Sequence, residues 1–218
     1  MLKVVVFDSG FGGELFADYF EVEMPVVEVI RVIDWRNANG YLKGSQTARK
    51  LAREAIRPYI GRVDLIVIAN QLVSITSLKY FRRKYRGQKF IGLGLKEPEG
   101  FLPREVLVLT TRAVAQTINY KMFLFRMKRK VGTMTVDEWL GKIDDGELST
   151  GEVEDAVRLA TRSFRPEEVV LAASQLVDIK RELQEIMGRN VKIYDSFRDT
   201  LRKACKALGI RGGTGKKR

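Results

Sequence analysis

Two amides follow a segment that is typical of a buried strand. Ile66-Val67-Ile68-Ala69 is an unbroken apolar run, and Asn70 and Gln71 come directly after it. Ligands bind outside the carboxyl ends of the strands of an open parallel sheet, so chemistry is expected here. Amides have no useful proton affinity near neutral pH. Asn70 and Gln71 can therefore bind or orient a ligand, but they cannot serve as an acid or a base.

The composition excludes several kinds of catalysis. The 218 residues contain one cysteine, Cys205, and no histidine. A disulfide within the chain is therefore impossible, and Ser-His or Cys-His catalysis and most zinc sites are excluded. Cys205 is expected to lie inside the last helix as a packed small hydrophobe. No metal and no cofactor is expected.

A glycine-rich turn follows the first expected strand, in the segment VVVFDSGFGGEL at 4–15. The turn has the polar residues Asp8 and Ser9, followed by three glycines in four residues. Such a loop can present backbone N–H groups to a carboxylate or phosphate, or it can be a tight turn with Asp8 as a structural acceptor. Both interpretations stay open. Leu15 stands where the dinucleotide fingerprint needs its third glycine, and the P-loop lysine is missing.

The chain is strongly basic, with 39 Lys and Arg against 27 Asp and Glu, a formal charge of +12. Such an excess favours nucleic acid or acidic proteins as partners. The basic residues cluster at 77–89 and at 125–130, with more in the tail. The residues that could bind such a partner are Lys79, Arg82, Arg83, Lys84, Arg86, Arg126, Lys128, Arg129 and Lys130.

Two interpretations of the first cluster stay open. Its cations could neutralise phosphates while Tyr80, Phe81 and Tyr85 stack on bases. Alternatively, the cluster is a solvated helix face whose aromatic rings point inward.

No apolar stretch approaches the roughly 18 residues that cross a bilayer, and the first residues lack a signal-peptide pattern. We therefore expect a cytoplasmic protein with no membrane partner.

Short β-branched runs alternate with longer helical patterns, which predicts an α/β protein with parallel sheets flanked by helices. Strands are expected at 2–8, 26–33, 63–69, 89–93, 105–110, 168–173 and 191–195. The clearest helical patterns lie at 45–59 and 74–85. Thr135-x-x-Glu138 and Ser149-x-x-Glu152 are typical of capping boxes, which predicts helices from Trp139 to about Ile143 and from Val153 to Phe164.

A Pro- and Gly-rich segment at 96–103 predicts a linker between two similar α/β domains. The first domain is expected to span 1–95, completed by a C-terminal helix in 198–218, and the second to span 96–197. A basic tail at 211–218 has too little apolar content to pack and is expected to be mobile. The segments IVIANQLVSI and VVLAASQLVDI resemble each other, either as two copies of one βα unit or by chance.

The order of these motifs resembles that of the aspartate/glutamate racemase superfamily, glutamate racemase in particular. FDSGFGG at 7–13 is similar to the opening turn of that family. Asp34 with Gly40-Tyr41 resembles its aspartate and Pro-Tyr-Gly, LTTRAVAQTINY at 109–120 its threonine-rich segment, and IYDSFRDTLRKA at 193–204 its closing strand and helix. The resemblance covers nearly the whole chain. It implies two α/β domains with a cleft between them.

The resemblance also implies that the family's catalytic apparatus is missing. Its racemases remove the α-proton from one face of an amino acid and return a proton on the other, using one cysteine thiol from each domain as the acid or base on each side of Cα. Those two positions fall on Asn70 and Ala173, and a neighbouring histidine falls on Gln175. The chain is therefore expected to be a non-catalytic homologue that binds an amino-acid-like ligand or a macromolecule. Asp8 or Asp195 would be the base of a surviving isomerase, and a nucleic-acid-associated role is a further alternative.

The same resemblance implies which residues would bind a small ligand: Asp8, Ser9, Asn70, Gln71, Thr111, Ser174 and Gln175. Amides and hydroxyls suit an amino-acid zwitterion, although an emptied site is the other possibility. Members of the family often pair, so a homodimer is expected.

Overall fold

The computed structural model describes residues 1–95, 105–127 and 129–210. The chain divides into two compact units. Unit 1 comprises Met1–Gly94 and Ser196–Arg218, and unit 2 comprises Leu95–Asp195. The predicted linker at 96–103 and the predicted tail at 211–218 lie outside the described residues, as does Lys128.

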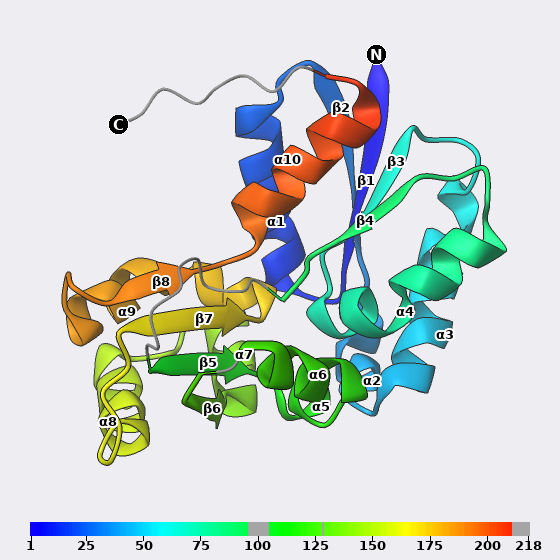
Figure 1. Cartoon of the computed structure of the whole chain (residues 1–218). Helices are drawn as coiled ribbons and strands as arrows, with labels where there is room; N and C mark the ends of the chain where they lie inside the picture. The colour runs from blue at the N-terminus through cyan, green and yellow to red at the C-terminus, as the bar shows by residue number, and fades with distance from the viewer. Residues whose placement is uncertain (96–104, 128, 211–218) are drawn as a thin grey trace. The chain divides into compact units, whose positions relative to one another are not determined.

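Unit 1 is built on a four-stranded parallel sheet in the order β2-β1-β3-β4. Figure 1 shows α1 and α10 on one face of this sheet and α3 and α4 on the other. The strands are β1 (Leu2–Asp8), β2 (Val27–Ile33), β3 (Leu65–Ile68) and β4 (Phe90–Gly92). The helices are α1 (Phe11–Glu23), the short α2 (Ala38–Tyr41), α3 (Ser45–Ile56), α4 (Gln71–Lys84) and α10 (Phe197–Leu208).

The central strands of unit 1 are buried on both faces. Val4–Phe7 of β1 and Leu65–Ile68 of β3 have no exposed side-chain surface. Helices on both sides of a parallel sheet require this continuous apolar run in place of the alternation of a half-exposed strand. The runs that predicted strands in the sequence are thus the centre of the core.

Unit 2 repeats the architecture with a parallel sheet in the order β6-β5-β7-β8. Its strands are β5 (Val106–Thr110), β6 (Val131–Thr135), β7 (Glu168–Ala172) and β8 (Lys192–Tyr194). Its helices are α5 (Arg112–Ala115), α6 (Ile118–Met127), α7 (Asp137–Asp144), α8 (Thr150–Ala160) and α9 (Lys180–Met187). Three short 3-10 helices at 35–37, 57–59 and 174–177 complete the described elements. The predicted two-domain α/β class is confirmed.

The two similar segments occupy equivalent places in the two sheets. IVIANQLVSI contains all but the first residue of β3 and the start of α4, while VVLAASQLVDI contains all but the first residue of β7 and the 3-10 helix after it. Each strand lies third in its sheet, next to the first strand of its unit. The resemblance between the segments therefore reflects equivalent positions in one repeated topology.

Some local predictions are wrong. The strand β6 was not expected, because Val131-Gly-Thr-Met-Thr135 is a partly exposed edge strand without an apolar run. Its presence also removes the predicted capping box at Thr135. Thr135 ends β6, and α7 begins at Asp137 without a side-chain cap. The box of Ser149 and Glu152 is confirmed, although α8 ends at Ala160, before the predicted Phe164.

The glycine-rich turn between β1 and α1 depends on close packing more than on unusual backbone angles. None of its glycines is among those with positive φ in the described chain, and Gly10 is extended at φ −165°. A Cβ added to Gly13 would lie 2.4 Å from the Cβ of Asp8 and 2.6 Å from a methyl of Ile33. Gly13 thus lets α1 pack directly against the ends of β1 and β2.

Replacing Gly13 with alanine should therefore destabilise unit 1. Overpacking of this kind typically costs about 1–3 kcal/mol, more than alanine gains in a helix. Urea unfolding followed by circular dichroism measures the change in the free energy of unfolding. Gly87→Ala in the same unit is the control, because an added Cβ meets nothing within 4 Å there. Equal stability of the two variants would contradict the packing role of Gly13.

Candidate functional site

The carboxyl ends of β1 and β3 bring three of the predicted site residues together. The two strands pair in register, with Phe7 opposite Ile68. Just beyond them, the Asn70 side-chain amide donates to Asp8 Oδ1 at 3.1 Å and to Ser9 Oγ at 2.8 Å. The backbone N–H of Ser9 also donates to Asp8 Oδ1, at 2.7 Å. All three residues are buried.

The remaining polar atom of the Asn70 side chain caps a helix. Its Oδ1 accepts the backbone N–H of Val73 at 3.0 Å, and Asn70 is the N-cap of α4. An N-cap asparagine satisfies one of the N–H groups that the first helical turn leaves unpaired. Both the donor and the acceptor of this amide are therefore engaged within unit 1, in a structural role.

Gln71 turns toward the neighbouring strand instead of toward Asp8. Its Nε2 donates to the carbonyl oxygen of Leu93 at 3.3 Å, just after β4. The hydroxyl of Ser74 donates to the same carbonyl at 2.5 Å. Gln71 and Ser74 thus bind the end of β4 to the first turn of α4.

A second polar group lies beyond the end of β2 and includes a residue that the sequence did not single out. The Tyr41 hydroxyl donates to Asp34 Oδ2 at 2.7 Å, and Asn37 Nδ2 donates to both oxygens of that carboxylate. Burial of the ring raises the pKa of Tyr41 well above its usual value, and the hydrogen bond to Asp34 raises it further. Asn37 is three residues from Asp34, a spacing that could have suggested the contact.

In unit 2, the predicted residues lie at the equivalent strand ends. Thr110 pairs with Ala172 in register, and its hydroxyl donates to the Ala172 carbonyl at 3.3 Å. Thr111 and Ala173 follow these two residues. Thr111 is the N-cap of α5, because its Oγ1 accepts the N–H of Val114 at 3.2 Å. Its hydroxyl oxygen thus has a structural role like that of Asn70.

The residue just after β7 offers no acid or base. Ala173 is buried and carries only a methyl group. Beside it, the Ser174 hydroxyl donates to Gln175 Oε1 at 3.3 Å. Asp195, the other carboxylate considered as a base, forms an ion pair with Lys180 at 2.5 Å.

Cys205 lies within α10, as expected, and its side chain belongs to the core of unit 1. It is buried, with its sulfur 3.4 Å from the sulfur of Met24. Burial raises the pKa of its thiol, so the reactive thiolate form is disfavoured. The predicted packing role is confirmed.

The basic clusters differ in how their charges are used. In the second cluster, Arg129 forms a buried ion pair with Glu168 at 2.5 Å, and Lys130 pairs with Glu105 at 2.5 Å. In the first cluster, Arg82 donates twice to the carbonyl of Phe90, at 3.0 and 2.8 Å. Arg126 and the remaining basic residues of the first cluster are exposed.

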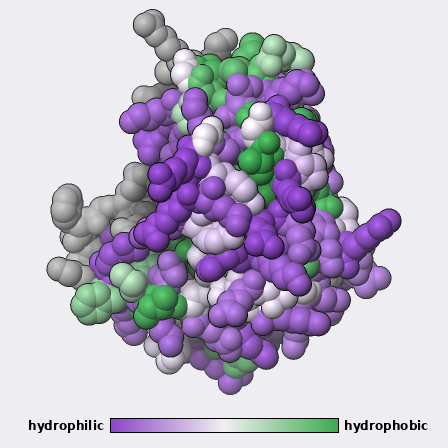
Figure 2. Space-filling model, turned by 90° about the vertical axis from the view of Figure 1, so that its right-hand side faces the viewer, coloured by the Kyte–Doolittle hydropathy of each residue, from purple (hydrophilic) through white to green (hydrophobic). Residues whose placement is uncertain are grey.

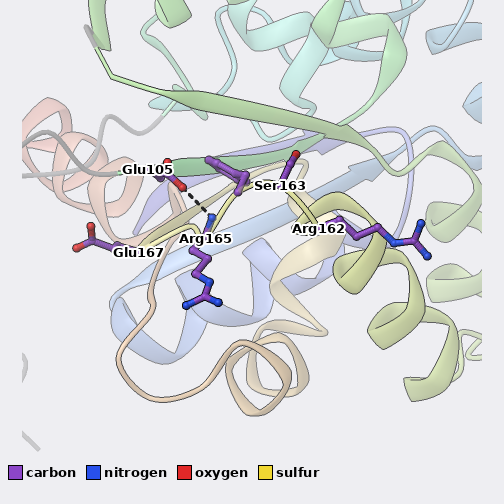
Figure 3. Close-up of a pocket in the computed structure, with 6 residues that line it drawn as sticks. Glu105, Arg162, Ser163, Arg165 and Glu167 are labelled. Carbon is purple, nitrogen blue, oxygen red and sulfur yellow. Dashed lines mark hydrogen bonds between the residues drawn. The ribbon is translucent and has the colours of Figure 1, made fainter.

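A hollow of about 610 Å³ lies at the amino ends of strands β5 and β7. Thr111 and Ser174 lie at the opposite, carboxyl ends of the same strands. Figure 3 shows the side chains of Arg162 and Arg165 extending in different directions. The side chain of Lys130 and the backbone N–H of Arg165 both donate hydrogen bonds to the Glu105 carboxylate. Both bonds lower the pKa of that carboxyl, and the bond from Lys130 has the larger effect. The polar groups of this hollow do not converge on a common point.

Searches for related proteins identify the fold. The structure resembles Escherichia coli glutamate racemase in complex with L-glutamate and an activator, with a TM-score of 0.82 and 19% identity over 99% of this chain and 85% of that one. It also resembles Francisella tularensis glutamate racemase in complex with D-glutamate, with a TM-score of 0.79 and 18% identity over 95% and 81%. An aspartate racemase homologue from Pyrococcus horikoshii matches with a TM-score of 0.55 and 15% identity, over 96% and 100%.

The chain therefore has the two-domain fold of the aspartate/glutamate racemases, and the predicted resemblance is confirmed at the level of the fold. No family model matches the sequence, and no curated protein matches it. Within residues 1–95, 105–127 and 129–210, no helix combines the length and the apolar character that crossing a membrane requires.

Asn70→Asp tests the hydrogen-bond assignment through its pH dependence. The new carboxylate would keep the cap on α4 but would stand about 3.1 Å from the Asp8 carboxylate. Two carboxylates this close raise the pKa of one of them in the folded state. A raised folded-state pKa stabilises the fold at low pH, and this stabilisation is lost as the pH rises through that pKa. We expect the variant to be closest to the wild type near pH 3, below the unfolded-state pKa of aspartate (about 3.9), and to lose about 1–3 kcal/mol relative to it as the pH rises to 7.5.

Urea unfolding of both proteins at several pH values measures this difference. Asn119→Asp, at an exposed position on α6, is the matched control and should show no comparable loss. A difference between Asn70→Asp and the wild type that does not change with pH would contradict the contact between Asn70 and Asp8.

Proposed function

We propose that this chain is a non-catalytic protein with the racemase fold, and that it works by binding. The proposal depends on the side chains that stand just beyond the carboxyl ends of β3 and β7. Asn70 uses its amide to cap α4 and to bond Asp8 and Ser9, and Ala173 has no functional group. Racemisation through two side chains needs a group on each side of Cα that can take up and return a proton. Neither position offers one.

The proposal predicts that the protein does not exchange the Cα proton of amino acids. The pure protein is incubated in deuterated water with L- and D-glutamate and with L- and D-aspartate, and deuterium at Cα is followed by NMR and mass spectrometry. We expect incorporation no faster than in buffer alone. The E. coli glutamate racemase, assayed identically, is the positive control.

Incorporation at an enzyme-like rate would overturn the non-catalytic proposal and favour an isomerase with a different base. Asp8→Asn then identifies that base, since the amide keeps the size of the side chain and removes its proton affinity. Asp195→Asn tests Asp195 in the same way and for the same reason.

A small amino-acid-like ligand is the partner that the strand ends of unit 1 would suit. Asp8 offers a buried carboxylate beside the hydroxyl of Ser9. These two groups suit the ammonium group of an amino acid, whose own carboxylate balances the charge of that ammonium. Two similar structures were solved with L- or D-glutamate, which supports an amino acid as the first ligand to test. The ligand would have to compete with the existing bonds of Asn70, so modest affinity is expected.

A thermal-shift screen with L- and D-amino acids and dicarboxylates tests this binding. We expect at least one compound to raise the melting temperature of the wild type, and the shift to disappear in both Asp8→Ala and Asp8→Asn. The two variants separate loss of the carboxylate from loss of packing. A flat screen at millimolar concentrations would count against a small ligand while leaving the absence of catalysis intact.

A further inference from the structure

The segment 43–95, which contains α3 and α4 and the loops around them, carries most of the excess positive charge of the chain. Residues 43–95 hold twelve Lys and Arg against two acids, Glu54 and Asp64, a net +10 in a chain whose total is +12. The sequence indicated only the part on α4. The structure adds the cations of α3, because α3 and α4 pack side by side on one face of the unit 1 sheet (Figure 1).

The cations of this surface, which we call the α3–α4 face, differ from those elsewhere in having few acidic partners. Arg31 contacts Glu14, Asp18 and Glu21, and the basic residues of unit 2 form several ion pairs. Within the described residues, in contrast, no ion pair involves the exposed cations of the α3–α4 face. These exposed cations are Lys50, Arg57, Lys79, Arg83, Lys84 and Arg86.

The local positive field is also evident at Tyr80. The guanidinium carbon of Arg49 lies 5.1 Å from the centre of the Tyr80 ring, and Lys84 Nζ lies 5.7 Å from it. The side chain of Arg53 lowers the pKa of Tyr80 through a hydrogen bond to its hydroxyl. Three cations from two helices thus surround one tyrosine.

The α3–α4 face lacks the apolar groups that other partners of a basic surface require. None of the exposed large hydrophobic residues of the described chain lies on α3 or α4. A helix that binds a lipid surface needs an exposed apolar side, and the centre of a protein interface is usually apolar. Figure 2, which views the side where α3 and α4 lie, shows a mainly hydrophilic surface.

Phe81 of α4 and Tyr85 just after it pack inward, whereas the ring of Tyr80 is covered by Arg49 and Lys84. Phe81 is buried and stacks on Phe90 with ring centres 5.7 Å apart, and Tyr85 lies 6.1 Å from Phe90. These rings hold α4 against β4 and are not presented for stacking on bases. Recognition by this face would therefore depend on charge and would be independent of base sequence.

We propose that the α3–α4 face binds the phosphate backbone of nucleic acid without sequence specificity. Lys79 and Arg83 lie one helical turn apart on the exposed side of α4, and Arg86 follows just beyond its end. Four residues of helix advance about 6 Å, so Lys79 and Arg83 can reach neighbouring phosphates, which are spaced about 3.4 Å apart along the axis of a duplex. This inference does not rest on the proposed absence of catalysis.

Fluorescence anisotropy with a labelled 30-base-pair DNA duplex, and with an RNA duplex of the same sequence, tests the proposal between 50 and 300 mM salt. The test variant is Lys79→Gln, Arg83→Gln, Arg86→Gln. The matched control is Arg198→Gln, Lys203→Gln, Lys206→Gln, which removes the same charge from exposed positions of α10 in the same unit. Circular dichroism confirms that both variants are folded.

We expect the test variant to bind at least about tenfold more weakly at 100 mM salt, with a salt slope shallower by about 3, since each phosphate contact contributes roughly 0.9 to that slope. The control should stay within about twofold of the wild type. The two duplexes separate DNA from RNA as the preferred source of phosphate, and binding of either one supports the proposal.

Three results would overturn it. The first is no binding by the wild type at 50 mM salt. The second is equal weakening in the two variants, which would assign binding to overall charge in place of this face. The third is displacement of the labelled duplex by polyglutamate as effectively as by unlabelled duplex at equal charge concentration, which would indicate an acidic protein as the partner.

Discussion

A buried amide must find a partner for each of its polar atoms, and Asn70 meets this requirement by joining three segments of unit 1. Its side chain bonds the last residue of β1, the hydroxyl of Ser9 and the first turn of α4. A thiol at the same place is a weak donor and acceptor and could not replace these bonds. The Asn70 side chain is therefore committed to holding the strand ends and the helix together.

The same topology thus supports different chemistry at its two equivalent strand ends. Beyond the end of β3 stands the amide of Asn70 beside the Asp8 carboxylate, while β7 is followed by the methyl group of Ala173 and the hydroxyl of Ser174. The fold is that of racemases whose sequences are 19% identical or less to this chain. A packed parallel sheet needs apolar strands and short turns, and many sequences satisfy this need. Function depends on the few residues beyond the strand ends, so a shared fold does not transfer it.

Charged side chains in this chain differ in whether burial obliges them to have a partner of opposite charge. The largely buried Arg129 is paired with the buried Glu168, because an unpaired charge in such a place would be costly. On the α3–α4 face the cations are solvated and need no partner for stability. Repulsion among them is tolerated because water and salt screen exposed charges over about 8–10 Å. Their clustering is consequently unexplained by the needs of the fold, which is why it points to a polyanionic partner.

Much of the fold was determined by the sequence itself. Continuous apolar runs such as Val4–Phe7 and Leu65–Ile68 can be stable only inside a covered sheet, and the Ser149 capping box defines the start of α8 through contacts between near neighbours. The lack of histidine and the single cysteine likewise exclude whole classes of catalysis, because those reactions need side chains that the chain does not contain.

Only the tertiary structure decided which distant groups meet. The partners of Asn70 lie 61 and 62 residues away, the edge strand β6 has no apolar run of its own, and the cations of α3 join those of α4 through packing. Gly13 is needed because Asp8 and Ile33 approach it from two strands, which no local pattern records. The periodicity of apolar residues and the capping motifs in a sequence predict only structure that depends on residues close together in the chain. Long-range contacts depend on how the elements pack, and the site is made of those contacts.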